Sequence, residues 1–235
     1  MVRWSTSRHK SGLTDGATAD MTSAAGLRDA GASRQQAPAG DAEPGVSYRE
    51  RLIAGLAVSI KEQGFRDTKI ADIVRHARTS RRTFYAEFAS KEECYVALLE
   101  ALNEGLRDQI AAAVDPALPW QAQVRQAVVA YVDNVASEPA LTLSWIREMP
   151  ALGNISRELQ RRAMDALADL LLRLANSEEF RRAGTVPMTR PLAIILLGGI
   201  RELTAAIVED SGDIHDLTEV TVEAATAILR PRPAR

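Results

Sequence analysis

The sequence predicts an all-α protein, with a three-helix domain at the N-terminal side of a larger helical bundle. Apolar residues recur at helical spacing from Tyr48 onward. No stretch alternates apolar and polar residues for long enough to form a strand, and no repeat recurs at a fixed period. Prolines and glycines divide the periodic part of the chain into segments of helical length.

The overall composition excludes several classes of protein. The chain has 235 residues and a net charge of −2, so it is not a uniformly basic coat protein for nucleic acid. A single cysteine, Cys94, excludes an internal disulfide framework and a cysteine-based zinc cluster. The longest uncharged apolar run, residues 191–200, is too short to span a bilayer, and no apolar segment follows the basic N-terminus. We therefore expect a cytoplasmic protein with no membrane partner.

Residues 1–46 differ from the rest of the chain. They are rich in Ser, Thr, Gly and Ala and show no apolar periodicity. Such a segment buries too little surface to offset its ordering entropy, so we predict a disordered tail. An alternative is a basic arm that uses Arg3, Arg8 and Lys10, although acidic residues cancel these charges. Met21 could also be the true start of the chain.

The first predicted helix begins at Tyr48 and carries Leu52, Leu56 and Ile60 on one face. Gly64 is placed to end it, since glycine readily adopts the conformation that terminates helices.

Two short helices and a long one are predicted next. Thr68 is placed to cap a helix over 69–76, and Ser80 to cap a helix that runs to about Phe88. Ser90 and Glu93 have the spacing of a capping box, which predicts the start of a further helix. The helices predicted for the body span residues 94–114, 119–137, 155–175, 191–210 and 215–229.

Residues 68–85 form a predicted helix-turn-helix. The exposed first half of its second helix would enter the major groove, where Arg81, Arg82 and Thr83 can contact base edges. Arginine can bond guanine O6 and N7 together, and a threonine methyl can meet the thymine methyl. The remaining residues of this predicted interface, most of them phosphate contacts, are Lys69, Arg78, Thr79, Ser80, Tyr85 and Lys91.

The charge distribution is uneven along the chain. Residues 47–93 hold ten basic and seven acidic residues, whereas residues 94–235 hold 14 basic and 19 acidic residues. The basic balance of the first segment suggests an end that binds a polyanion. Ordinary fluctuation of surface charge is an equally good explanation of these small counts.

The segment 48–99 resembles the DNA-binding domain of the TetR-type transcriptional regulators. The matching motifs are Ile-Ala-Asp-Ile-Val at 70–74, Ser-Arg-Arg-Thr-Phe-Tyr at 80–85 and Phe-Ala-Ser-Lys-Glu at 88–92. The resemblance implies an Ω-shaped homodimer, operator binding by paired DNA-binding domains and a ligand pocket in the body. The sequence differs from the family pattern at Arg78 and Thr79, where the family usually has glycine and an aliphatic residue, respectively. If the turn requires a left-handed backbone conformation at this position, arginine is less favourable than glycine by about 1 kcal/mol. Either the turn differs from that of the family or a phosphate contact of Arg78 offsets the strain.

The resemblance divides the chain into a tail (1–46), a DNA-binding domain (47–93) and a ligand-binding and dimerisation domain (94–230). Aromatic and sulfur-containing residues of the body offer an apolar wall with polar handles. The predicted ligand-binding residues are Trp120, Tyr131, Trp145, Met149, Met164, Leu167 and Phe180. Residue by residue, a role in the ordinary core is the stronger interpretation.

The last two predicted helices carry coiled-coil spacing and small residues that permit close helix approach. We predict that they pair with a second copy through Leu196, Gly199, Ile200, Leu203, Ile207, Val220, Ala224 and Ile228. Burial within one chain is the alternative.

The sequence therefore predicts a transcriptional regulator, most simply a repressor, that binds a palindromic DNA operator as a dimer and leaves it on binding a small apolar effector. We expect no enzymatic activity, no cofactor and no metal, because the chain contains no metalloprotease motif, phosphate loop or dinucleotide fingerprint. The alternative is a helical protein that binds small molecules or senses redox state through Cys94, with altered DNA binding.

Overall fold

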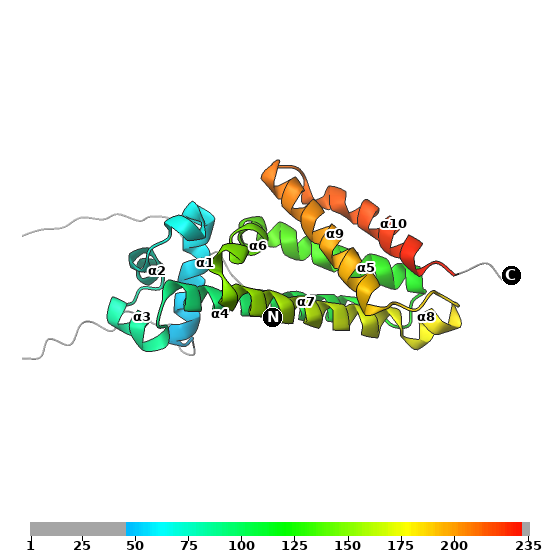
Figure 1. Cartoon of the computed structure of the whole chain (residues 1–235), viewed down its shortest axis with the longest axis horizontal. Helices are drawn as coiled ribbons and strands as arrows, with labels where there is room; N and C mark the ends of the chain where they lie inside the picture. The colour runs from blue at the N-terminus through cyan, green and yellow to red at the C-terminus, as the bar shows by residue number, and fades with distance from the viewer. Residues whose placement is uncertain (1–45, 232–235) are drawn as a thin grey trace, which may run out of the picture. The chain divides into compact units, whose positions relative to one another are not determined.

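A computed structural model describes residues 46–231, and every regular element in this range is helical (Figure 1). The predicted tail lies outside the described residues, except Val46. The elements are α1 (Tyr48–Asp67), α2 (Ile70–His76), α3 (Arg81–Glu87), α4 (Lys91–Ala113), α5 (Trp120–Ser137), α6 (Pro139–Arg147), η1 (Met149–Leu152), α7 (Asn154–Ala175), α8 (Glu178–Arg182), α9 (Arg190–Glu209), η2 (Ile214–Asp216) and α10 (Leu217–Leu229).

Helix α1 follows its sequence prediction closely. Its apolar face is buried, with Leu52 and Leu56 fully inaccessible. Ser47 caps the helix, since its hydroxyl accepts from the Glu50 N–H while the Glu50 carboxylate accepts from the Ser47 N–H. Gly64 adopts φ 77°, which breaks the helical path three residues before α1 ends at Asp67.

The prediction that Thr68 caps α2 is wrong. Its hydroxyl donates to the carbonyl of Gly64 at 2.7 Å, so it serves the end of α1 instead. Lys69 is the N-cap residue of α2, and its backbone N–H donates to the Asp72 carboxylate. Ser80 caps α3 as predicted, because its hydroxyl accepts from the Thr83 N–H.

A glycine allows α1 and α2 to touch. A Cβ at Gly55 would lie 2.6 Å from the carbonyl oxygen of Ile73 and 3.2 Å from the Cβ of Ala77. The two backbones are therefore in contact at this point, and only glycine fits there.

Helix α4 begins as its capping residue predicts, although the box is not complete. The Ser90 hydroxyl accepts from the Glu93 N–H, but the Glu93 carboxylate accepts from the N–H of Ala89. The five predicted body helices are present within a few residues, and the short helices α6 and α8 were not predicted.

Two large apolar cores organise the described residues. The first joins α1–α4 to Leu141, Met149 and Leu159 from α6, η1 and α7. The second lies among α5, α7, α9 and α10, which form the bundle in Figure 1. Because the first core includes body residues, the three-helix domain is not built from its own residues alone.

Candidate DNA interface and ligand cavity

Helix α3 presents a polar, basic surface to solvent. Arg81, Arg82 and Tyr85 are exposed, the last by 59%. On the opposite side Phe84 is fully buried and holds the helix against the first core. Thr83 is half-buried, and its hydroxyl lies 3.0 Å from that of Ser80, so it is less available to a base than the two arginines.

The turn before α3 contains a left-handed arginine. Arg78 has φ 49°, the left-handed conformation that a glycine adopts readily, so the turn keeps this conformation in spite of the side chain. Arg51 on α1 secures the turn, since its Nη2 donates to the carbonyls of Ala77 and Arg78 at 2.6 and 2.7 Å. The Arg78 side chain is exposed and Thr79 follows it in the turn, whereas Lys69 lies at the other end of α2. Arg51 was not among the predicted site residues, and only the fold reveals its role.

Lys91 has a different environment from the one predicted. Its Nζ donates to the carbonyls of Phe65 and Thr68 at 2.8 Å each and to that of Arg66 at 3.3 Å. It also lies over the Phe65 ring. A cation favours the carbonyl end of a helix, so Lys91 stabilises the end of α1 and its donors are occupied. The prediction of a free lysine facing a phosphate needs this correction.

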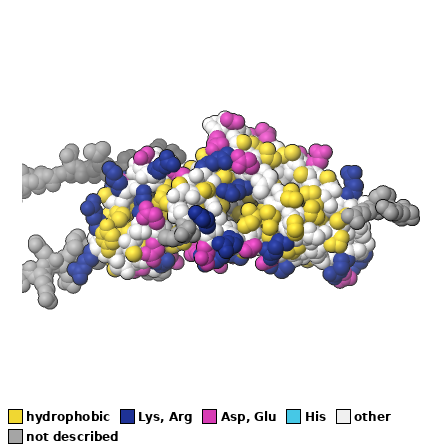
Figure 2. Space-filling view, viewed as in Figure 1, with side chains coloured by type: hydrophobic (Ala, Val, Ile, Leu, Met, Phe, Trp, Pro, Cys, Tyr) yellow, Lys and Arg dark blue, Asp and Glu magenta, His cyan; other side chains and the backbone are white. Residues whose placement is uncertain are grey.

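Lys and Arg side chains are spread over the α1–α3 end of the face in Figure 2. Near α2, part of this charge is neutralised, because Arg75 and His76 lie within 4 Å of Glu62. At this end of the molecule, Arg81 and Arg82 on α3 and Arg78 in the preceding turn have no acidic partner within 4 Å among the described residues.

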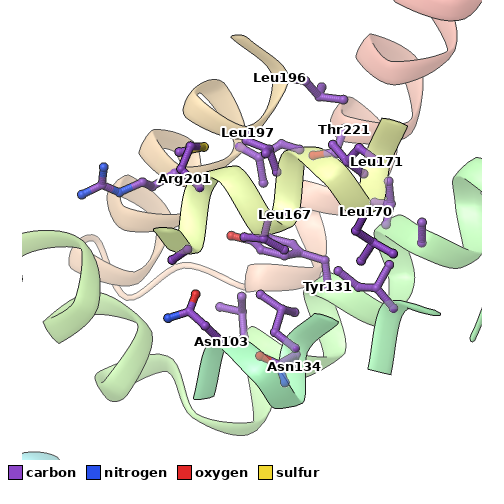
Figure 3. Close-up of a pocket in the computed structure, with 18 of the residues that line it drawn as sticks. Asn103, Tyr131, Asn134, Leu167, Leu170, Leu171, Leu196, Leu197, Arg201 and Thr221 are labelled. Atoms are coloured by element: carbon purple, nitrogen blue, oxygen red, sulfur yellow. The ribbon is translucent and has the colours of Figure 1, made fainter. Parts of the chain in front are cut away.

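The body contains a cavity of about 300 Å³ lined mainly by apolar side chains from α4–α10 (Figure 3). Of the predicted ligand residues, Tyr131, Trp145, Met164, Leu167 and Phe180 line it. Trp120 and Met149 do not.

These two exceptions have structural positions. Trp120 packs against Phe180, with ring centroids 6.0 Å apart, in the second core. Met149 is fully buried in the first core. Sequence periodicity marks both as buried but cannot distinguish a cavity wall from a filled core.

Several polar groups interrupt the apolar wall of the cavity. The Tyr131 hydroxyl pairs with Thr204 at 2.8 Å, and burial raises the pKa of Tyr131. Three further lining residues carry a buried polar atom without a hydrogen-bond partner among the described residues: Gln160 Nε2, Arg201 Nε and Thr221 Oγ1. These three residues were not among the predicted ligand-binding residues, because apolar periodicity places their helices but does not show whether a polar side chain points into the cavity.

The exposed apolar face of α9 and α10 differs from the predicted stripe. Leu196, Ile200, Ile207 and Ile228 pack against the second core of their own chain. Gly199, Leu203, Val220 and Ala224 are exposed, as an intermolecular face requires. Ile194 and Ile195 are exposed as well, and a Cβ at Gly198 or Gly199 would meet nothing within 4 Å.

Helix α9 is also long and apolar enough to span a membrane by length and composition alone. A salt bridge from Glu202 to Arg147 connects α9 to α6. One such helix is weak evidence for a membrane segment.

Helix α6 connects the cavity to the DNA-binding domain. Leu141, Trp145 and Ile146 line the cavity. On the same helix the Ser144 hydroxyl lies 2.6 Å from the Tyr95 hydroxyl and donates to Glu148 at 2.5 Å.

The Glu148 carboxylate completes this connection, because it accepts from the backbone N–H of Phe65, directly after the break in α1. Helix α6 therefore provides a connection between the body and the DNA-binding domain in addition to α4.

Cys94 is fully buried beneath the DNA-binding domain. Burial raises the pKa of its thiol to about 12, so the reactive thiolate is absent at neutral pH. This environment fits a structural residue and gives no support to a redox sensor. Among residues 46–231, no group of three or more His, Cys, Asp or Glu side chains could hold a metal ion.

Comparison with known proteins agrees with this arrangement. Residues 52–98 match the sequence family described as bacterial regulatory proteins, tetR family. An uncharacterized HTH-type transcriptional regulator, YdgC from Bacillus subtilis, is 33% identical over 63 residues, which are 27% of this chain and 32% of the relative. The matched segment therefore spans about a third of that relative.

Solved structures extend the likeness to the body. The fatty acid degradation regulator FadR from Bacillus halodurans superposes with a TM-score of 0.64 at 18% identity, covering 82% of this chain and all of the other. FadR from Bacillus subtilis, solved with stearoyl-CoA, gives 0.63 at 15% identity, covering 77% and 98%. At these identities the likeness concerns the fold.

A helix-turn-helix with an exposed basic helix, joined to a helical body, defines a DNA-binding transcriptional regulator. The match over residues 52–98, the curated relative and the shared fold support a TetR-family transcriptional regulator.

Proposed function

We propose that this chain is a one-component repressor, which binds a palindromic operator as a homodimer in the cytoplasm and leaves it when a small, mainly apolar effector fills the cavity. The observation that carries the proposal is the pairing of two features in one chain. An exposed basic recognition helix lies at one end, and an apolar cavity lies in the body.

The DNA-binding part of the proposal rests on α3. Arg81 and Arg82 are exposed and have no acidic partner among the described residues, so both guanidinium groups are free to meet base edges. We assign the phosphate contacts to Lys69, Arg78 and Tyr85, with Thr79 and Ser80 positioning the turn. Residues 47–93 are the proposed DNA-binding domain, and residues 94–230 the proposed effector and dimer domain.

The dimer part rests on the outer face of α9 and α10. Ile195 is 65% exposed and Leu203 46%, and two large apolar side chains exposed along one helix form an apolar surface that a partner can cover. The exposed glycines Gly198 and Gly199 would let a partner helix approach closely. A second copy supplies a complementary face by two-fold symmetry, and a palindromic site requires two recognition helices.

The effector part rests on the cavity and on α6. The cavity volume lies at the lower end of the range typical of ligand sites. Trp145 and Ile146 place α6 in its wall, while Glu148 bonds to the DNA-binding domain. A ligand that moves α6 would therefore change the spacing or tilt of the recognition helices. Such a ligand releases DNA only if it binds the DNA-incompetent state more tightly.

The test is the selection of bound duplexes from a random DNA pool with purified full-length protein at two salt concentrations. We expect a near-palindromic site with half-sites about one helical turn apart, or a multiple of it. An Arg81→Ala/Arg82→Ala variant serves as the matched control. Binding that is weak and independent of sequence would contradict the proposal and favour a ligand-binding protein with altered DNA binding.

A further inference from the structure

The cavity wall is not uniformly apolar, and its polar groups share one property. Gln160 Nε2 and Arg201 Nε are hydrogen-bond donors, and the Thr221 hydroxyl can donate as well. None of these three atoms has a partner among the described residues, although each is buried. An unpaired buried polar atom costs about 1–3 kcal/mol, so an occupant that supplies acceptor atoms is favoured over a pure hydrocarbon.

Arg201 determines which charge such an occupant carries. Two of the residues that line the cavity are formally charged, Arg201 and Glu138. Glu138 is paired with Lys61 at 3.1 Å. Arg201 donates through Nη2 only to the backbone carbonyl of Ile146, at 2.9 Å, and no carboxylate lies within 4 Å of it among the described residues.

The acidic residue next to Arg201 does not compensate its charge. Glu202 pairs with Arg147 at 2.9 Å on the outer side of the helix. The charge of Arg201 instead acts on the cavity wall, where it opposes the rise that burial produces in the pKa of Tyr131. The wall therefore carries a net positive charge with one guanidinium N–H still free.

The size and shape of the cavity limit the rest of the ligand. Its volume of about 300 Å³ is about twice that of an engineered apolar cavity that holds benzene. Figure 3 shows Arg201 at the left of the view and Thr221 at the right beside Leu171, with Leu167 and Tyr131 between them. A ligand anchored at Arg201 would thus extend an apolar chain or ring across these side chains.

We propose that the cavity selects a small amphipathic monoanion, whose carboxylate pairs with Arg201 while its apolar body lies among Leu167, Leu171 and Tyr131. The inference deepens the proposed function by naming the chemical class of the effector. Ligand binding is measured on DNA-free protein, so its outcome is independent of whether an operator is found.

The experiment titrates the full-length protein with three probes of equal chain length: octanoate, 1-octanol and octylammonium. Trp145 lines the cavity and reports binding by fluorescence, and calorimetry provides a second readout. We expect octanoate to bind about 10- to 100-fold more tightly than 1-octanol, the range for one hydrogen bond between charged groups, and octylammonium to bind most weakly.

Variants then assign the preference to one residue. Arg201→Gln should abolish the preference for the acid over the alcohol, and Arg201→Lys should retain most of it. The matched control is Arg173→Gln, which removes the same charge from an exposed position on α7 outside the cavity wall. Its preference should equal that of the wild type.

The comparison of probes on the wild-type protein requires no substitution, so it stands even if Arg201→Gln fails to fold. Equal affinity for octanoate and 1-octanol would overturn the proposal, as would binding of none of the three probes. An unchanged preference in folded Arg201→Gln would overturn the assignment to Arg201.

Discussion

Replacement of Arg78 by glycine separates the stability of the turn from its contact with DNA. Arg78 is held at φ 49°, where an L-residue with a side chain costs about 1–2 kcal/mol relative to the right-handed region. Glycine removes this strain but adds about 0.5–1 kcal/mol of chain entropy to the unfolded state. The net result is a gain of about 0.5–1 kcal/mol for Arg78→Gly.

Such a gain corresponds to an increase in Tm of about 1–4 °C for a chain of this size. The bonds from Arg51 survive the change, because they end on the carbonyls of Ala77 and Arg78 and not on the side chain. If the exposed guanidinium contacts one phosphate in each half-site, its loss lowers the magnitude of the salt slope by about 1.8 per dimer.

The matched control is Arg78→Ala, which removes the same guanidinium but keeps a Cβ at positive φ. It should lose the same salt dependence and gain no stability. The assay combines thermal unfolding with operator titrations at several salt concentrations. A glycine variant less stable than the alanine variant would refute the strain argument, and an unchanged salt slope in both would refute the phosphate contact.

Four further changes test other parts of the structure. Gly55→Ala would place a Cβ 2.6 Å from a carbonyl oxygen, and we expect a loss of about 1–3 kcal/mol in thermal unfolding; an unchanged Tm would contradict the close approach of α1 and α2. Lys91→Met would remove donors to three carbonyls, which should lower stability by about 1.5–3 kcal/mol while leaving the salt slope of DNA binding unchanged; a flatter slope would restore the predicted phosphate contact. Arg82→Ala should weaken specific operator binding by about 1–3 kcal/mol, whereas equal affinity would remove Arg82 from the base-reading set. Burial raises the pKa of Cys94 to about 12 and also raises that of Tyr95, so the unfolded chain releases these protons at a lower pH than the folded chain. The free energy of unfolding should therefore fall as the pH rises above about 9. Cys94→Ala should reduce this pH dependence in denaturant titrations.

Local rules of sequence predicted most of the fold. Capping at Ser80 and the break at Gly64 depend on a few neighbouring residues, and each is present in the structure. The prediction for Thr68 failed because its hydroxyl had two helix ends within reach, and only the packing of α1 decides between them.

The candidate sites were less predictable, because they depend on long-range contacts. Lys91 contacts carbonyls 23–26 residues earlier in the chain, a relation that no spacing rule encodes. The stripe of Leu196, Ile200 and Ile207 has the periodicity of an interface, yet its rotation about the helix axis directs it toward its own core. Periodicity defines a face, but the neighbouring helices determine which surface that face covers.

The two sides of α6 have a thermodynamic consequence. One side contributes Trp145 and Ile146 to the cavity, and on the other Ser144 bonds to Glu148, directly after the helix, which accepts from Phe65 of the DNA-binding domain. If this helix couples the sites, linkage requires that operator DNA lower the affinity for the effector by the same factor by which the effector lowers the affinity for DNA. Effector affinities measured on free protein would then overestimate sensitivity at an occupied promoter. The concentration needed for half-maximal release would rise with the affinity of each operator, so one protein could switch different promoters at different effector levels.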